Sequence, residues 1–154
     1  MKKPASIPRR KQETILIVDD DASVREVLTR VLDGEGYLVL SAGNGPEALR
    51  IAAANPIDLV LLDLNMPMQS GWDTFEELTT HNPSLGVIIV TARSGQLFTS
   101  LAAGVAALLE KPLDYPKMLQ TVRAVLAESP EVRLARMVGQ HGDLRYLASG
   151  GKEI

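Results

Sequence analysis

The sequence contains no cysteine, which excludes disulfide frameworks, thiolate metal sites and cysteine nucleophiles. Aromatic residues make up only 4% of the chain, and no apolar run approaches the roughly 18 residues of a membrane span. An excess of positive charge is also lacking: the net charge is −3, so we expect no direct contact with nucleic acid. The N-terminal segment has no apolar stretch of the kind found in secretory signals, and the default expectation is a cytoplasmic protein.

What is present is the composition of a folded domain, with 45% hydrophobic and 23% charged residues in a chain of 154. That length suits one hydrophobic core with modest extensions. Residues 1–13 carry five basic side chains and two prolines, which predicts a flexible arm. Residues 14–127 form the predicted domain, and residues 128–154 form a C-terminal tail.

Strand and helix patterns alternate through residues 14–127. Apolar runs rich in β-branched residues predict five strands, and apolar residues spaced by three and four predict helices between them. The strands are expected at 14–18, 37–41, 57–62, 86–90 and 106–109, and the helices at 22–33, 46–54, 72–80, 96–103 and 115–127. Runs that are apolar at nearly every position indicate strands buried on both faces. The predicted fold class is therefore α/β, with a doubly wound parallel sheet.

The sequence of the C-terminal tail predicts one short helix. Ser129 is a favoured helix cap, and Pro130 suits the first helical turn. Leu134, Met137 and Val138 fall at helical spacing, and we expect them to form its narrow apolar side.

Polar residues follow four of the predicted strands. Asp19 and Asp20 follow the first strand, Asp63 the third, Thr91 the fourth and Lys111 the fifth. In an open parallel sheet the carboxyl ends of the strands meet at one edge, where ligands bind. Three carboxylates at that edge repel one another and need protonation or a cation to stay together. Oxygen ligands suit Mg²⁺ or Mn²⁺, and a nearby ammonium suits an anion. The pattern favours phosphoryl transfer, in which a carboxylate can itself be the acceptor.

These residues lie in motifs that resemble the receiver domain of two-component response regulators. The resemblance covers residues 14–127 and keeps the order and spacing of the family. Its motifs are ILIVDDD (15–21), AGNGPEAL (42–49), LVLLDLNMP (59–67) with Gly71, VIIVTA (87–92) and Lys111–Pro112. The resemblance implies a flavodoxin-like (βα)5 fold with strand order 2-1-3-4-5.

The resemblance also implies a metal site. Asp63 is the expected phosphoryl acceptor and a ligand of Mg²⁺. Asp20 is a further direct ligand, and Asp19 is expected to act through water. The backbone carbonyl of Asn65 completes the protein ligands.

On the phosphoryl side, the resemblance implies that Thr91 and Lys111 contact the phosphoryl oxygens and that Ala92 leaves room for them. The Lys111–Pro112 peptide is expected to be cis. Leu108 departs from the family pattern, because receivers usually carry Tyr or Phe three residues before the lysine as a rotamer switch. The sequence therefore predicts an atypical switch position.

The implied function is phosphorelay signalling by a stand-alone receiver acting through protein–protein contacts. The donor would be a histidine kinase or a phosphotransfer protein, and the output protein is unknown. A homodimer is one form that such contacts could take. We expect self-phosphotransfer and slow hydrolysis of the aspartyl phosphate, without turnover of an independent substrate.

Two alternatives stay open. A pseudo-receiver would be an interaction module that is never phosphorylated, and the missing aromatic at Leu108 is compatible with it. A nucleotide-binding domain is the other, since residues 43–48 satisfy G-x-G-x-x-A and Asp63 lies 20 residues after Gly43. Pro46 argues against it, because proline removes a backbone N–H at the helix start, where a pyrophosphate needs one.

Overall fold

The computed structural model describes residues 11–66, 71–92, 104–138 and 145–147. The elements, in chain order, are β1 (Thr14–Val18), α1 (Ala22–Asp33), β2 (Leu38–Ala42), α2 (Gly45–Ala54), β3 (Leu59–Asp63), α3 (Gly71–His81), β4 (Gly86–Thr91), β5 (Ala107–Glu110), α5 (Tyr115–Leu126), α6 (Pro130–Met137) and β6 (Arg145–Leu147). They lie within two residues of their expected bounds, apart from β6, which was not expected. The expected helix at 96–103 and most of the basic arm lie outside the described residues. Among the helices described, none has the length and apolarity needed to cross a membrane.

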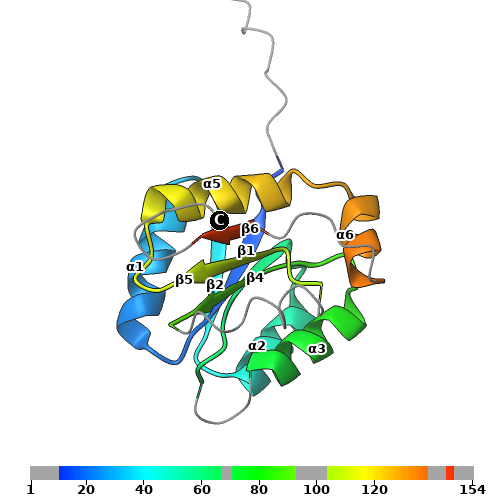
Figure 1. The fold of residues 1–154 in the computed structure, drawn as a ribbon. Helices are drawn as coiled ribbons and strands as arrows, with labels where there is room; N and C mark the ends of the chain where they lie inside the picture. The colour runs from blue at the N-terminus through cyan, green and yellow to red at the C-terminus, as the bar shows by residue number, and fades with distance from the viewer. Residues whose placement is uncertain (1–10, 67–70, 93–103, 139–144, 148–154) are drawn as a thin grey trace, which may run out of the picture.

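The strands form one parallel sheet in the order β2-β1-β3-β4-β5-β6 (Figure 1). The first five follow the predicted order, which confirms the flavodoxin-like fold. β6 adds a sixth strand beside β5, with Ala107 opposite Arg145 and Leu109 opposite Leu147. The sequence did not predict this strand, because three residues are too few to show a period.

Helices cover both faces of the sheet, so the central strands are buried on both sides (Figure 1). Successive side chains of β1 point to opposite faces of the sheet and so pack into two different core layers. Leu16 and Val18 pack with apolar side chains of α2 and α3, whereas Ile15 and Ile17 pack with those of α1 and α5. The near-continuous apolar runs of the sequence are explained by this double burial.

Side-chain caps fix where two helices begin. Asp21 precedes α1, and its carboxylate accepts hydrogen bonds from the backbone N–H of Ser23 at 2.8 Å and of Val24 at 3.4 Å. Ser129 precedes α6 and accepts from the N–H of Val132 at 3.2 Å, as the tail sequence predicted. The third aspartate of the acidic run therefore belongs to the helix and not to the cluster before it.

The tail helix α6 docks on the domain through arginines. Arg136 is buried and forms an ion pair with the equally buried Glu128. Arg133 donates hydrogen bonds to the carbonyl oxygens of Val125 at 2.9 Å, Leu126 at 3.2 Å and Ser84 at 3.3 Å. Two of these carbonyls lie at the last turn of α5, where a positive charge is favourable.

The expected apolar side of α6 was wrong at two of its three positions. Leu134 and Val138 are 44% and 75% exposed, and only Met137 packs against the core. Met137 and the carbonyl of Arg136 both lie 3.0 Å from where a side chain on Gly104 would begin. The docked face is therefore defined by Arg133, Arg136 and Met137, with carbonyl oxygens of the domain and the Glu128 carboxylate as partners of the two arginines.

Candidate functional site

Three carboxylates meet at the carboxyl ends of β1 and β3. Asp19 and Asp20 directly follow β1, and Asp63 is the last residue of β3. One carboxylate oxygen of each lies within 4.8 Å of the other two. Asp19 and Asp63 are buried, whereas Asp20 is exposed. The sheet thus brings together the three carboxylates that the sequence pattern placed at this edge.

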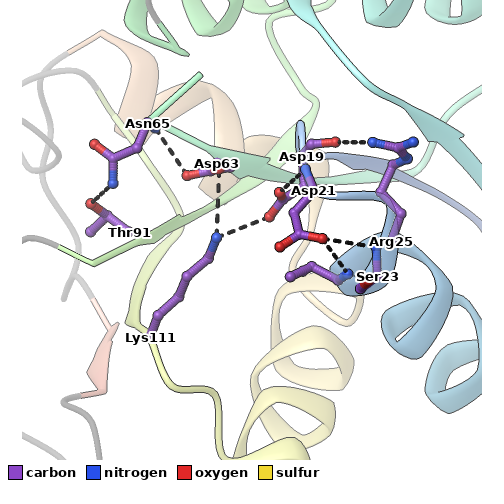
Figure 2. A network of polar contacts seen from close by, with 9 residues as sticks. Asp19, Asp21, Ser23, Arg25, Asp63, Asn65, Thr91 and Lys111 are labelled. Atoms are coloured by element: carbon purple, nitrogen blue, oxygen red, sulfur yellow. Dashed lines mark hydrogen bonds and ion pairs between the residues drawn. The ribbon is translucent and has the colours of Figure 1, made fainter. Parts of the chain in front are cut away.

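Lys111 bridges the two buried carboxylates (Figure 2). Its Nζ lies 3.0 Å from Asp19 Oδ2 and 3.5 Å from Asp63 Oδ2. The backbone N–H of Lys111 donates to the carbonyl of Thr91 at 2.9 Å, which holds the main chain at the end of β5. The peptide between Lys111 and Pro112 is cis, as expected.

A short polar chain links Asp63 to the end of β4 (Figure 2). The backbone N–H of Asn65 donates to Asp63 Oδ1 at 2.9 Å, and Asn65 Nδ2 donates to Thr91 Oγ1 at 3.3 Å. Thr91 is fully buried, and Ala92 after it is exposed. The side-chain contact of Asn65 was not among the expected ones. Its N–H contact follows a known local pattern, in which an aspartate accepts from the amide two residues on.

Each polar group of Asp19 has a partner: the backbone N–H, the carbonyl oxygen and both carboxylate oxygens. Its N–H donates to the carbonyl of Ala42 at 3.1 Å, and its Oδ1 accepts from the N–H of Asp21 at 2.9 Å. Oδ2 contacts Lys111, and the carbonyl oxygen accepts from Arg25 Nη1 at 2.6 Å (Figure 2). Arg25 was not among the site residues predicted from the sequence. Its only signal there is its position one turn into the helix that follows the acidic run.

Burial raises the pKa of Asp63 above its ordinary value of 3.8. The N–H of Asn65 and the charge of Lys111 oppose this rise, while the charges of Asp19 and Asp20 add to it. For Lys111, burial alone would lower the pKa, but the hydrogen bond to Asp19 and the two buried negative charges outweigh it, so the pKa of Lys111 is raised. Burial and the neighbouring carboxylates therefore both oppose the charged form of Asp63.

We expect Asp63→Asn to raise the melting temperature at neutral pH in metal-free buffer. Because the pKa of Asp63 is raised in the folded state, the folded protein binds more protons than the unfolded chain, and stability falls as pH rises from 3.8 through the folded-state pKa. Asparagine carries no such cost. An increase of a few degrees is expected, since 1 kcal/mol moves the melting temperature of a chain this size by roughly 2–4 °C.

Thermal scans of both proteins at pH 7 and pH 4 would check this. The advantage of Asp63→Asn should shrink at pH 4, where the wild-type carboxyl group is partly protonated. A variant that melts below wild type at pH 7 would contradict the repelling cluster.

The donor set fits a small divalent cation. Carboxylate oxygens are the ligands that Mg²⁺ and Mn²⁺ prefer. Oxygens bound directly to one Mg²⁺ lie at most about 4.2 Å apart, twice the usual ligand distance of about 2.1 Å. The three carboxylates, with one oxygen of each within 4.8 Å of the others, are therefore close enough together to face one such ion.

Leu108 lies in β5, opposite Ile89 of β4, and its side chain is fully buried. It belongs to the same core layer as α2 and α3. A leucine in this position contributes packing and has no polar group to exchange between the interior and the surface.

The glycine motif at 42–49 forms the start of α2. Asn44 caps the helix by accepting from the N–H of Glu47 at 2.9 Å, and Glu47 Oε2 accepts from the N–H of Gly43 at 3.2 Å. Two of the amides that could bind a pyrophosphate, those of Gly43 and Glu47, are thus engaged within the loop, and Pro46 offers none. This arrangement disfavours the nucleotide-binding alternative.

Comparison with known sequences points to one family. The model of a family described as "Response regulator receiver domain" matches residues 15–123. The chain is 39% identical over 141 residues to the transcriptional regulatory protein ZraR of Klebsiella oxytoca, covering 86% of this chain and 32% of that protein. It is 39% identical over 114 residues to the response regulator MprA of Mycobacterium sp. (strain KMS), covering 73% and 50%. The chain thus spans about a third to a half of the length of these relatives.

Solved structures give the same result. A response regulator receiver domain protein from Methanospirillum hungatei JF-1 is similar with a TM-score of 0.72 and 29% identity, over 75% of this chain and 94% of that one. The response regulator protein TrrA from Thermotoga maritima, solved in complex with Mg(2+)-BeF, is similar with a TM-score of 0.69 and 30% identity, over 74% and 99%.

Proposed function

The chain belongs to the receiver-domain family of response regulators, and from this premise we propose that Asp63 accepts a phosphoryl group in two-component signalling. The observation that carries the proposal is the buried Asp63 carboxylate, 3.5 Å from the Lys111 ammonium and within 4.8 Å of two further carboxylates. The donor is a histidine kinase or a phosphotransfer protein, as membership of the family implies.

The transfer is a displacement at phosphorus. One carboxylate oxygen of Asp63 forms the new P–O bond while the P–N bond to the donor histidine breaks, and the imidazole leaves and takes up a proton. We propose that Lys111 and Thr91 contact the phosphoryl oxygens. Two contacts support this: the Lys111 ammonium lies 3.5 Å from Asp63, and the Thr91 hydroxyl accepts a hydrogen bond from Asn65, whose N–H holds Asp63. These groups act by position and charge, which supply most of the catalysis in phosphoryl transfer.

The cation is Mg²⁺ or Mn²⁺. Asp20 and Asp63 would hold it directly, with the backbone carbonyl of Asn65, and Asp19 would contribute through water. Bound there, the ion would supply the positive charge that offsets the carboxylates and the incoming phosphoryl group. Asp20 is the exposed carboxylate of the three, so it is the one that a cation from solvent meets first.

We expect Asp20→Ala to weaken Mg²⁺ binding by at least about tenfold. Two unit charges about 4 Å apart interact by about 1–4 kcal/mol, and the double charge of Mg²⁺ raises this to about 2–8 kcal/mol, whereas about 1.4 kcal/mol corresponds to a factor of ten. A titration followed by backbone amide shifts or by the fluorescence of Trp72 measures the effect. Asp33→Ala removes the same charge from the exposed end of α1 and is the matched control. Equal affinities in the two variants would overturn the assignment of Asp20.

Incubation with acetyl phosphate and Mg²⁺, followed by intact-mass measurement, tests the function. The wild-type protein should gain one phosphoryl group, and Asp63→Asn should gain none. A wild-type protein that stays unmodified under these conditions would instead support the pseudo-receiver alternative.

We further propose that residues 14–127 form the receiver unit and that its phosphorylation is passed on through protein–protein contacts. Because Leu108 is fully buried, phosphorylation should reshape the surface of β5 and α5 less than an aromatic switch would. Amide shifts on adding beryllofluoride, a phosphoryl mimic, are expected to be large at Thr91 and Ala92 and small at Leu108 and along α5. Shifts centred on Leu108 and α5 would refute this.

A further inference from the structure

We propose that Arg25 is a positioning residue for the cation site: it holds the carbonyl oxygen of Asp19 and thereby fixes the peptide group that carries Asp20. The inference rests on the proposed function, because it gives Arg25 a part in Mg²⁺ binding. It accounts for a contact and for a glycine that neither the resemblance nor the acidic cluster explains.

The contact is short and charge-assisted. Arg25 Nη1 lies 2.6 Å from the carbonyl oxygen of Asp19 (Figure 2). Side chains on a helix point back toward its N-terminus, so an arginine one turn into α1 returns over the end of β1. Hydrogen bonds from a charged donor are shorter and stronger than neutral ones.

The held carbonyl controls the next residue. It belongs to the planar peptide group that joins Asp19 to Asp20, so its orientation sets the direction in which the chain leaves toward the Asp20 carboxylate. Asp19 and Asp63 are fixed through their own carboxylates by backbone N–H groups and by Lys111. The side chain of Asp20 makes no hydrogen bond or ion pair with the residues that the structure describes. Its placement therefore depends on the backbone before it.

Gly43 provides the space for this arrangement. A Cβ at Gly43 would lie 3.3 Å from Arg25 Nη1 and 3.7 Å from Cζ, so the guanidinium rests directly against the backbone of the β2–α2 loop. The φ angle of Gly43 is not in the positive range, and close approach is thus the reason for glycine here. The carbonyl of Ala42, the last residue of β2, accepts from the N–H of Asp19, so the chain around Gly43 contacts Asp19 at its N–H as well as through Arg25.

An electrostatic role and a positioning role of Arg25 predict opposite changes in Mg²⁺ affinity when its charge is removed. A cation near the N-terminus of a helix is unfavourable, and a positive charge near the acidic cluster competes with Mg²⁺. If Arg25 acted only by its charge, neutralising it would tighten Mg²⁺ binding. If it positions Asp20, neutralising it weakens binding.

The experiment measures the Mg²⁺ dissociation constant from backbone amide shifts in wild type, Arg25→Gln, Arg25→Lys and Arg30→Gln. Arg30 lies on the same helix in an exposed pair with Glu26 and controls for net charge. We expect Arg25→Gln to weaken binding by the order of tenfold, as loss of an outer partner of a metal ligand does. Arg25→Lys should recover part of that loss, and Arg30→Gln should match wild type. Binding in Arg25→Gln that equals or exceeds that of Arg30→Gln would overturn the proposal.

A second variant keeps the test decisive if Arg25→Gln does not fold. Gly43→Ala retains the arginine but pushes its guanidinium by a few tenths of an ångström. It should weaken Mg²⁺ binding in the wild-type background and add nothing to Arg25→Gln, because both changes act through one contact. Fully additive effects would contradict the proposal. If wild type itself binds no Mg²⁺ and gains no phosphoryl group, the proposed function fails; if wild type does both and the variants match it, only the role of Arg25 fails.

Discussion

Replacement of Arg136 by methionine is expected to release α6 from the domain. The side chains of Arg136 and Glu128 are each 8% exposed, and removing one partner of a buried ion pair costs about 3–5 kcal/mol because the remaining charge stays out of water. Undocking of α6 returns Glu128 to solvent, so the cost should appear as release of this helix and not as unfolding of the sheet. Amide hydrogen exchange of residues 130–138 should therefore lose its protection, while that of β1 and β3 stays unchanged.

The chain offers a matched control for this prediction. Arg30 and Glu26 form an ion pair on α1 whose side chains are 76% and 64% exposed, and such pairs contribute at most about 1 kcal/mol. Arg30→Met should leave exchange unaltered. Adding Glu128→Gln to Arg136→Met should restore part of the protection, because it removes the stranded charge. Continued protection of α6 in Arg136→Met would show that Met137 and Arg133 hold the helix without the ion pair.

Gly71→Ala is expected to lower the free energy of unfolding by up to about 2 kcal/mol. Gly71 begins α3 and packs against the chain after Asp63: an added Cβ would lie 2.6 Å from the Cα of Leu64 and 2.9 Å from the carbonyl oxygen of Asp63. Alanine within a helix would ordinarily gain about 1 kcal/mol over glycine. Overpacking typically costs about 1–3 kcal/mol, and here the obstacle is backbone, which cannot turn aside. The cost of the clash exceeds the gain in helix propensity, so the net change is destabilising.

Denaturant unfolding measures this change, and Gly36→Ala is the comparison. A Cβ added at Gly36 would meet no atom within 4 Å, but the φ angle there is +90°, so this substitution costs conformational strain alone, about 1 kcal/mol. Gly71→Ala should also slow labelling by acetyl phosphate, since the displaced Leu64 adjoins Asp63, the proposed acceptor. A variant at Gly71 that is as stable as wild type would mean that the loop after β3 yields easily.

Local sequence rules were sufficient to predict which strand ends carry the site and which residues cap the helices near it. The apolar runs end at Asp19 and Asp63, and parallel strands bring such ends together whatever the loops do. Asp21 and Ser129 cap helices because short polar side chains accept from the first free N–H groups. Each of these rules needs only a few neighbouring residues.

Contacts between distant segments could not be predicted in the same way. The sequence pattern of the tail helix singled out Leu134, Met137 and Val138 and gave no signal for Arg133 and Arg136. These arginines pack inward because carbonyls of α5 and the carboxylate of Glu128 accept their hydrogen bonds. The contact of Arg25 with Asp19 depends on the path of the β2–α2 loop at Gly43. A charged side chain can be buried only where partners accept its hydrogen bonds. The periodicity of a sequence shows which residues are polar, but not which of them have such partners.

β6 also bears on the tendency of the protein to aggregate, because it covers the edge of the sheet at β5. Pairing with Arg145–Leu147 gives β5 a neighbour on its outer side, and the β5 segment so covered, Ala107–Leu109, is wholly apolar. Natural sheet edges are usually protected by lysine, proline or a bulge, and an apolar edge without them is a template for a strand from another molecule. A chain cleaved before residue 145 would lose this neighbour of β5, so we expect the cleaved protein to self-associate more readily than the full chain.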